Sequence, residues 1–178
     1  ENRACPGAGA CGGQFTANTM AIAFEMLGIS PMGSASVPAN DPKKADVARR
    51  CGELVMGLVR DNLCARDVMT PEAFENAISA VLMTGGSTNS VLHLLAVAQE
   101  AGVDLQIDDF DKISRKTPLL ADLKPGGRFV ANDMYKAGGN VVIANRLKEA
   151  NLLHPNEKTV SGKTIGEEAD GMDETEKQ

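Results

Sequence analysis

The sequence is poor in aromatic residues and has no long apolar run. It contains no Trp, one Tyr and five Phe among 178 residues. No stretch approaches the roughly 20 apolar residues that a membrane-spanning helix needs. No secretory signal peptide is recognisable either, although the chain opens with Glu1 rather than Met, which leaves open an earlier true N-terminus. We therefore expect no membrane partner and a cytoplasmic location.

Positive charge is also scarce. The chain has 18 basic against 24 acidic residues, a net charge of −6, which argues against nucleic acid as a partner. Its four cysteines are irregularly spaced, as expected for reduced thiols in a cytosol rather than for a disulfide scaffold. Cys51 and Cys64 fall within or at the end of an apolar helical pattern, so we expect both to be buried as small hydrophobic residues.

Helix signals dominate what is present. The apolar spacing predicts helices at residues 14–27, 41–63, 70–85, 87–101, 109–114 and 140–150. Gly28 is a suitable C′ residue for the first helix, and Asp41-Pro42 and Thr70-Pro71 open the second and third with an N-cap residue followed by Pro. Apolar positions nearly encircle the fourth helix, which indicates burial on most sides.

Strand signals are few. Residues 103–107 alternate between apolar and polar side chains and predict a short strand, and 119–123 and 128–131 read as extended. The fold class expected is therefore α/β: a helix-rich domain with few strands, such as a piece of a larger α/β protein. We assign residues 1–166 to this partial domain. The polar, acidic residues 167–178 have almost nothing to bury, so we expect a disordered tail or an artificial boundary there.

The most informative motif is a cysteine on a glycine-rich loop, CPGAGACGG at residues 5–13, directly before the first predicted helix. The unpaired N–H groups of a helix start favour the thiolate form of Cys11, which is the form that ligates metals. Flanking glycines leave room for a bulky group such as an iron–sulfur cluster. A buried thiol in a tight turn explains the spacing equally well, and two cysteines cannot hold a cluster alone.

Four stretches carry a resemblance to a known family. They are CPGAGACGGQFTANTMAIAFEMLGISPMGSASVPA at residues 5–39, TGGSTNSVLHLLAVA at 84–98, DFDKISRKTPLLADLKPGGRFV at 109–130 and LLHPNEKTVSGKTIGE at 152–167. In this order they resemble the family of dihydroxy-acid dehydratase, 6-phosphogluconate dehydratase and the sugar-acid dehydratases. The resemblance covers nearly the whole chain and implies part of the N-terminal, cluster-binding α/β domain of an iron–sulfur dehydratase.

The resemblance also implies a set of cofactors and partners. Three cysteines would hold the cluster, [2Fe–2S] favoured and [4Fe–4S] possible, with Cys11 as one ligand and two others upstream of Glu1. Cys5 is only a weak candidate ligand. Mg²⁺ would serve in the complete enzyme, and the catalytic base would be a serine of a C-terminal domain outside this chain. The partners expected are a small-molecule substrate and a second copy in a homodimer.

The implied reaction removes water from a 2,3-dihydroxy carboxylic acid to give a 2-oxo acid. Substrates of the 2,3-dihydroxy-3-methylbutanoate type would place it in branched-chain amino-acid biosynthesis, and CGGQFTANTM at residues 11–20 favours this branch over the phosphogluconate branch. Two alternatives stay open. One is a sugar-acid dehydratase of the same family, and the other is a catalytically inactive fragment of such an enzyme.

Two further segments contain candidate substrate-lining residues. In TGGSTN, residues 84–89, one predicted helix ends and the next begins, so Ser87, Thr88 and Asn89 could face an anionic substrate. Helix capping explains most of the segment equally well, with Gly85 or Gly86 as the C-cap of one helix and Ser87 or Thr88 as the N-cap of the next. Ser34 and Ser36, in the loop after the first helix, could face the cluster side, although turn chemistry alone is the favoured explanation.

Other polar residues have simpler explanations. We expect His93 to be a core histidine of the fourth helix rather than a catalytic one. The acidic cluster at residues 108–111 lacks the Gly and distal Glu of a calcium loop and is interpreted as helix-start charge.

Overall fold

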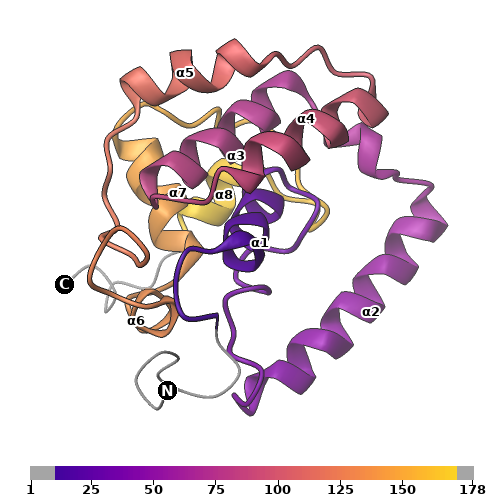
Figure 1. The fold of residues 1–178 in the computed structure, drawn as a ribbon. Coiled ribbons are helices and arrows are strands. Elements are labelled where there is room, and N and C mark those ends of the chain that lie inside the picture. Colours follow the sequence, from indigo (N-terminus) through magenta and orange to yellow (C-terminus); the bar gives the residue numbers. More distant parts are fainter. Residues whose placement is uncertain (1–10, 172–178) are drawn as a thin grey trace.

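The computed structural model describes residues 11–171 as a bundle of helices (Figure 1). In chain order the elements are α1 (Thr16–Met26), α2 (Lys43–Asp61), the 3₁₀ helix η1 (Ala65–Asp67), α3 (Pro71–Met83), α4 (Asn89–Ala101), α5 (Ile107–Lys116), α6 (Ala131–Lys136), α7 (Asn140–Glu149) and α8 (Ile165–Ala169). No strand occurs in this range, which holds only two isolated bridges, Leu123 with Phe129 and Lys158 with Thr164. The expected α/β class is therefore not confirmed.

Helix α3 lies at the centre of the bundle. Its contact with α1 is the most extensive between any two helices of the described residues, and it also packs against α4, α5 and α7. Phe74 and Ile78 of α3 are almost fully buried, as are Met26 and Leu27 at the end of α1 and Leu147 of α7. The core thus forms around two segments that the sequence identifies as apolar helices.

Local signals set the ends of these helices as predicted. Thr70 caps α3 through its hydroxyl, which accepts a hydrogen bond from the Ala73 N–H at 3.0 Å, and Pro71 occupies the first helical position. After α1, Gly28 takes a φ of +83°, in the left-handed region where a side chain is disfavoured. A Cβ at Gly28 would also lie 2.8 Å from the Lys158 carbonyl oxygen, so the chain passes closely there.

The predicted strand at residues 103–107 is wrong. The stretches 119–123 and 128–131, expected to be extended, form no strand and contribute only the isolated bridge between Leu123 and Phe129. Residues 103–106 form a loop, because the Gln106 N–H donates to the Asp109 carboxylate at 2.9 Å and so caps α5 instead of entering a ladder. Near residue 120, the N–H groups of Leu120 and Ala121 both donate to the carbonyl of Met83 at the end of α3. Residues 128–131 lead into α6, a short helix the sequence pattern did not reveal. A strand needs a neighbouring strand to hydrogen-bond with, and alternation over four or five residues does not show that such a neighbour exists.

The expected disorder of the tail is also wrong where the structure describes it. Helix α8 covers the proposed boundary at residue 167, and Ala169 is fully buried. The Lys148 ammonium of α7 pairs with Asp170 at 2.6 Å. Residues 172–178 lie outside the described range. A capping box at Thr164 and Glu167 is the signal that identifies this helix.

Two amphipathic helices are less covered than their sequences predict. Figure 1 shows α2 running apart from the other helices, and none of its residues is buried. On α4 only Ser90, Leu94 and Ala98 are buried, and 66% of the Leu92 surface is exposed, so the expected burial on most sides is wrong. None of the helices between residues 11 and 171 is long and apolar enough to cross a membrane.

Candidate functional site

Cys11 is half-buried and lies on the segment that leads into α1. The residues directly after Cys11 contact a loop that is far away in the sequence: the Gln14 N–H donates to the Lys124 carbonyl at 2.6 Å. A Cβ at Gly13 would come within 2.4 Å of the same oxygen, so only glycine fits there. The Gly13 carbonyl in turn accepts from the Asn18 side chain at 2.8 Å. The approach of Cys11 to α1 is therefore held at several points.

The TGGSTN turn, residues 84–89, packs against the first turns of α1. Two buried side chains make the connection. The Gln14 amide donates to the Thr84 hydroxyl at 2.7 Å, and the Thr19 hydroxyl accepts from the Ser87 N–H at 3.0 Å. A Cβ at Gly86 would lie 2.6 Å from a methyl group of Val81. The structure therefore brings the 84–89 turn against residues 14–19, which follow Cys11 directly in the sequence.

The three candidates in this turn have different surroundings. The Asn89 amide donates to the Thr16 hydroxyl and to the Ser87 hydroxyl, both at 2.8 Å, and the Asn89 N–H donates to the same Ser87 hydroxyl at 3.3 Å. Thr88 occupies the N-cap position of α4, yet its side chain makes no capping hydrogen bond and is exposed. Asn89 and Ser87 thus have structural partners, whereas the Thr88 hydroxyl is free to meet a ligand.

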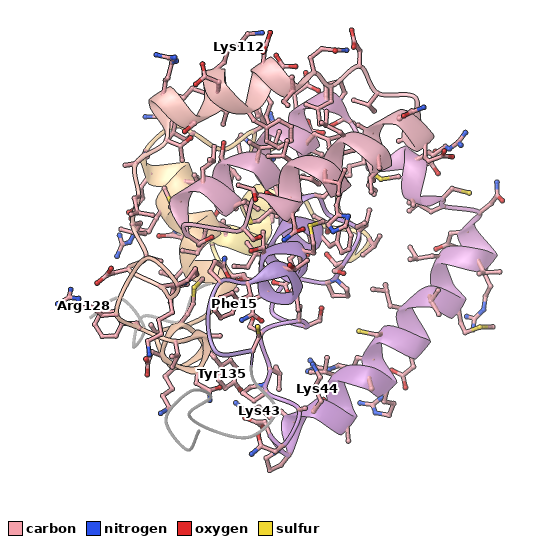
Figure 2. All side chains as sticks on the ribbon, in the orientation of Figure 1. Phe15, Lys43, Lys44, Lys112, Arg128 and Tyr135 are labelled. Carbon is pink, nitrogen blue, oxygen red and sulfur yellow. The ribbon has the colours of Figure 1, made fainter. Side chains whose placement is uncertain are left out.

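The loop carrying the other two candidates meets the opposite side of the α1 start. A small cavity of about 40 Å³ lies there, and its lining combines apolar side chains with the polar residues Gln14, Asn18, Ser36, Tyr135 and Asn140. Figure 2 marks Tyr135, whose hydroxyl donates to Asp41 at 3.1 Å. The Ser36 hydroxyl oxygen is shielded from solvent and has no hydrogen-bond partner among the described residues. Ser34 does not line this cavity.

Sequence reasoning missed two residues of this region, Gln14 and Glu25. Both are polar, and at most 2% of either surface is exposed. Gln14 bridges to Thr84, and Glu25 lies inside the apolar run of α1, which ends at Met26. A charged residue at a buried position of an apolar helix is the available signal, because burying an unpaired charge is costly and implies partners.

The described residues supply at most one ligand for an iron–sulfur cluster. Cys51 is half-buried on α2 and Cys64 is exposed, so the expected burial of Cys64 is wrong and that of Cys51 is only partial. Between residues 11 and 171 no group of three or more His, Cys, Asp or Glu side chains is placed to hold a metal ion. Cys5 lies outside the described residues. His93 is half-buried rather than a core residue.

Comparison with known proteins agrees with these features. The family model described as "Dihydroxy-acid/6-phosphogluconate dehydratase N-terminal" matches residues 1–168. The chain belongs to this dehydratase family. It is 61% identical over 175 residues to the dihydroxy-acid dehydratase of Koribacter versatilis, which covers 98% of this chain and 30% of that protein. A dihydroxy-acid dehydratase of Thermus thermophilus is 52% identical over 170 residues, 96% of this chain and 31% of the relative.

The chain matches only part of the length of each of these dehydratases. The chain spans about 30% of the length of the curated relatives it matches, including an archaeal one from Natronomonas pharaonis that is 55% identical over 168 residues. The cysteine loop, the 84–89 turn and the Ser36 loop all fall within the region shared with the family. The site described above is therefore one portion of a dehydratase N-terminal domain.

Proposed function

We propose that this chain contributes one wall of the active site of a dihydroxy-acid dehydratase. The observation that carries the proposal is the packing of the 84–89 turn against residues 14–19, directly after Cys11, through hydrogen bonds between residues 70 and 68 positions apart in the sequence. The relatives bear the name dihydroxy-acid dehydratase, which supports a dihydroxy carboxylic acid as the substrate class.

The proposed reaction is the loss of water across C2 and C3 of the substrate. A base takes the C2 proton, the C3 hydroxyl leaves as water, and the resulting enol tautomerises to the 2-oxo acid. A bound iron–sulfur cluster, with Mg²⁺ in the complete enzyme, would supply Lewis acidity toward the departing hydroxyl. Cys11 would provide one thiolate ligand, and further ligands and the base would come from the rest of the complete protein.

The residues of this chain would act by binding and orienting the substrate. Thr88 offers an exposed hydroxyl at the N-terminus of α4, where the helix dipole favours a carboxylate. Asn89 and Ser87 fix the turn through their mutual hydrogen bond and through Thr16. Ser36 lies on the other side of the α1 start, where its buried hydroxyl has no hydrogen-bond partner among the described residues. These positions define two sides of a polar substrate wall.

Within the family we favour 2,3-dihydroxy-3-methylbutanoate and its methylated homologue, the substrates of branched-chain amino-acid biosynthesis, for a cytoplasmic homodimer. A sugar-acid dehydratase is the second candidate, since the matching family also includes 6-phosphogluconate dehydratase. Assaying the complete protein with a branched 2,3-dihydroxy acid, a sugar acid and 6-phosphogluconate separates the three. Preference for either of the last two would replace the branched-chain assignment.

The cluster assignment is tested by cysteine substitution in the complete protein. Cys11→Ser should abolish cluster incorporation, because a hydroxyl is a much poorer iron ligand than a thiolate. Cys51→Ala and Cys64→Ala are matched controls that should retain iron content and visible absorption. Equal loss of iron in all three variants would contradict the special role of Cys11.

A further inference from the structure

Glu25 is a carboxylate in the interior of the bundle. It lies near the end of α1 and none of its surface is exposed. Its Oε1 accepts a hydrogen bond from the Ala35 N–H at 2.7 Å, and its Oε2 accepts from the Gly33 N–H at 2.9 Å and from the Asn140 amide at 2.8 Å. The buried Glu25 carboxylate accepts three hydrogen bonds and so links α1 to two other segments of the chain.

The first of these segments is the loop that carries Ser36. Glu25 receives two N–H groups of this loop within three residues, at Gly33 and Ala35. Among the described residues, one other hydrogen bond joins residues 33–36 to another element, and it is long: the Lys44 ammonium donates to the Ser34 carbonyl at 3.4 Å. The position of the backbone on either side of Ser34 therefore depends mainly on the Glu25 carboxylate.

The second segment is the start of α7. Asn140, its first residue, is 3% exposed and bonds Glu25 directly. The preceding Gly139 has a φ of +67°, and a Cβ there would lie 3.2 Å from the Ser36 hydroxyl oxygen. Glycine at this position lets Ser36 pack against the start of α7. Glu25 thus bonds to a neighbour of each residue in this contact: to Ala35 beside Ser36, and to Asn140 beside Gly139.

Every hydrogen-bond partner that the described residues supply to the Glu25 carboxylate is a donor. Burial raises the pKa of Glu25 above its ordinary value, and the negative charge of Glu168 adds to the rise. The hydrogen bonds from Ala35, Asn140 and Gly33 act in the opposite direction, because each stabilises the carboxylate. Since every partner donates, an amide in place of the carboxylate would direct its NH₂ group at another donor.

These contacts lie beside the small cavity at the first turns of α1. The cavity is lined by Gln14 and Asn18 from the α1 region, by Ser36 from the loop and by Asn140 from α7, and Glu25 bonds to the last two segments. We infer that Glu25 is a positioning residue of the proposed dehydratase site, which acts by holding the Ser36 hydroxyl at this cavity. The inference rests on the proposed function, since Ser36 belongs to the proposed substrate wall.

The first test measures the loop directly in the 178-residue chain. Glu25→Gln should accelerate amide hydrogen exchange at Gly33 and Ala35 by tenfold or more relative to the wild-type chain. Asn76→Asp is the matched control. Asn76 is also fully buried and holds a loop, by bonding the backbone N–H and carbonyl of His154, but it does not line the cavity. Unchanged exchange at Gly33 and Ala35 in Glu25→Gln would overturn the inference.

The second test measures catalysis in the complete enzyme. Glu25→Gln should lower kcat/KM at least tenfold with normal iron content, whereas Asn76→Asp should keep the wild-type kinetics of the folded fraction. Ser36→Ala should cause a comparable loss, and the double variant should be little worse than either single one, because both act through the same hydroxyl. Full additivity of the two losses would overturn the inference.

The outcomes separate this inference from the proposed function. If the wild-type complete protein forms no 2-oxo acid, the proposed function is wrong, and hydrogen exchange still decides whether Glu25 holds the loop. If Glu25→Gln does not fold, Ser36→Ala decides the catalytic part, because it removes a hydroxyl without a protein hydrogen bond and should fold normally. Wild-type kinetics in Ser36→Ala would then overturn the inference.

Discussion

At the scale of single residues, short polar side chains decide how the site is assembled. Thr16 and Thr19 of α1 bond to Asn89 and Ser87, and Gln14 bonds to Thr84. Each such hydrogen bond contributes about 0.5–1.5 kcal/mol net, but leaving one buried partner unpaired costs about 1–3 kcal/mol. The QFTANT segment after the cysteine loop therefore serves as the docking edge for the 84–89 turn as well as the start of a helix.

The 84–89 turn has both a capping and a substrate role in our proposal, and Thr88 separates them. Thr88→Ala in the complete enzyme should lower kcat/KM about tenfold, since a hydrogen bond to a charged group is worth roughly 1.5–3 kcal/mol. Its melting temperature should stay close to wild type, because the Thr88 side chain makes no capping bond. Steady-state kinetics and a thermal melt on the same variant measure the two effects.

Two other substitutions complete this experiment. Thr19→Val removes a buried hydroxyl that bonds the Ser87 N–H, so it should destabilise the protein by about 1–3 kcal/mol. Asn89→Ala should lower both the stability and kcat/KM. The Asn89 amide bonds to Thr16 and Ser87, and Asn89 also borders the proposed substrate wall. Wild-type kinetics in Thr88→Ala would show that the 84–89 turn has only a structural role.

At the scale of elements, helices with similar sequence patterns have different surroundings. Both α2 and α3 are amphipathic and begin after an X-Pro pair, but most of the α3 residues are buried and none of the α2 residues is. Apolar periodicity identifies the face of a helix that requires a partner. It does not state whether that partner lies within the same stretch of chain.

The difference between α2 and α3 predicts unequal sensitivity to substitution in the 178-residue chain. Val59→Ser on α2, where 69% of the surface is exposed, should change the free energy of unfolding by no more than about 0.5 kcal/mol. Phe74→Ala on α3, fully buried, should cost about 3–5 kcal/mol. Urea unfolding followed by circular dichroism measures both. A large loss in Val59→Ser would show that α2 is covered in solution.

At the scale of the whole molecule, the described residues form a core but leave apolar side chains uncovered. About half or more of the surface of Val55, Leu92, Leu119 and Phe129 is exposed, and these residues belong to three different segments: α2, α4 and the loop between α5 and α6. The described part also offers a single candidate cluster ligand, Cys11, and no grouped metal ligands. We therefore expect activity to require the portion of the dehydratase beyond this chain.

The isolated chain should consequently be inactive. Purified and reconstituted anaerobically with iron and sulfide, it should neither retain a cluster by visible absorption nor form a 2-oxo acid from a 2,3-dihydroxy acid. The complete protein treated in the same way is the control. Measurable turnover by the 178 residues alone would show that they hold a full active site.

The sequence by itself determined the helices with strong local signals and the family. Thr70-Pro71 and Gly28 mark helix ends through backbone chemistry that acts within a few residues, so α1 and α3 were predictable. The cysteine loop and the TGGSTN motif were likewise recognisable as candidate site segments. Residues 103–107 were misread, because an alternating pattern without a pairing partner does not make a strand.

Only the tertiary structure decided which of these segments meet and which residues hold them. Gln14, Thr19 and Glu25 read as ordinary members of an apolar helix, and their roles depend on partners 8 to 115 residues away. Such contacts are selected by burial, where an unpaired polar group is costly, rather than by local backbone preference. Sequence periodicity shows that α1 is buried, but it does not show which residues donate hydrogen bonds to Glu25.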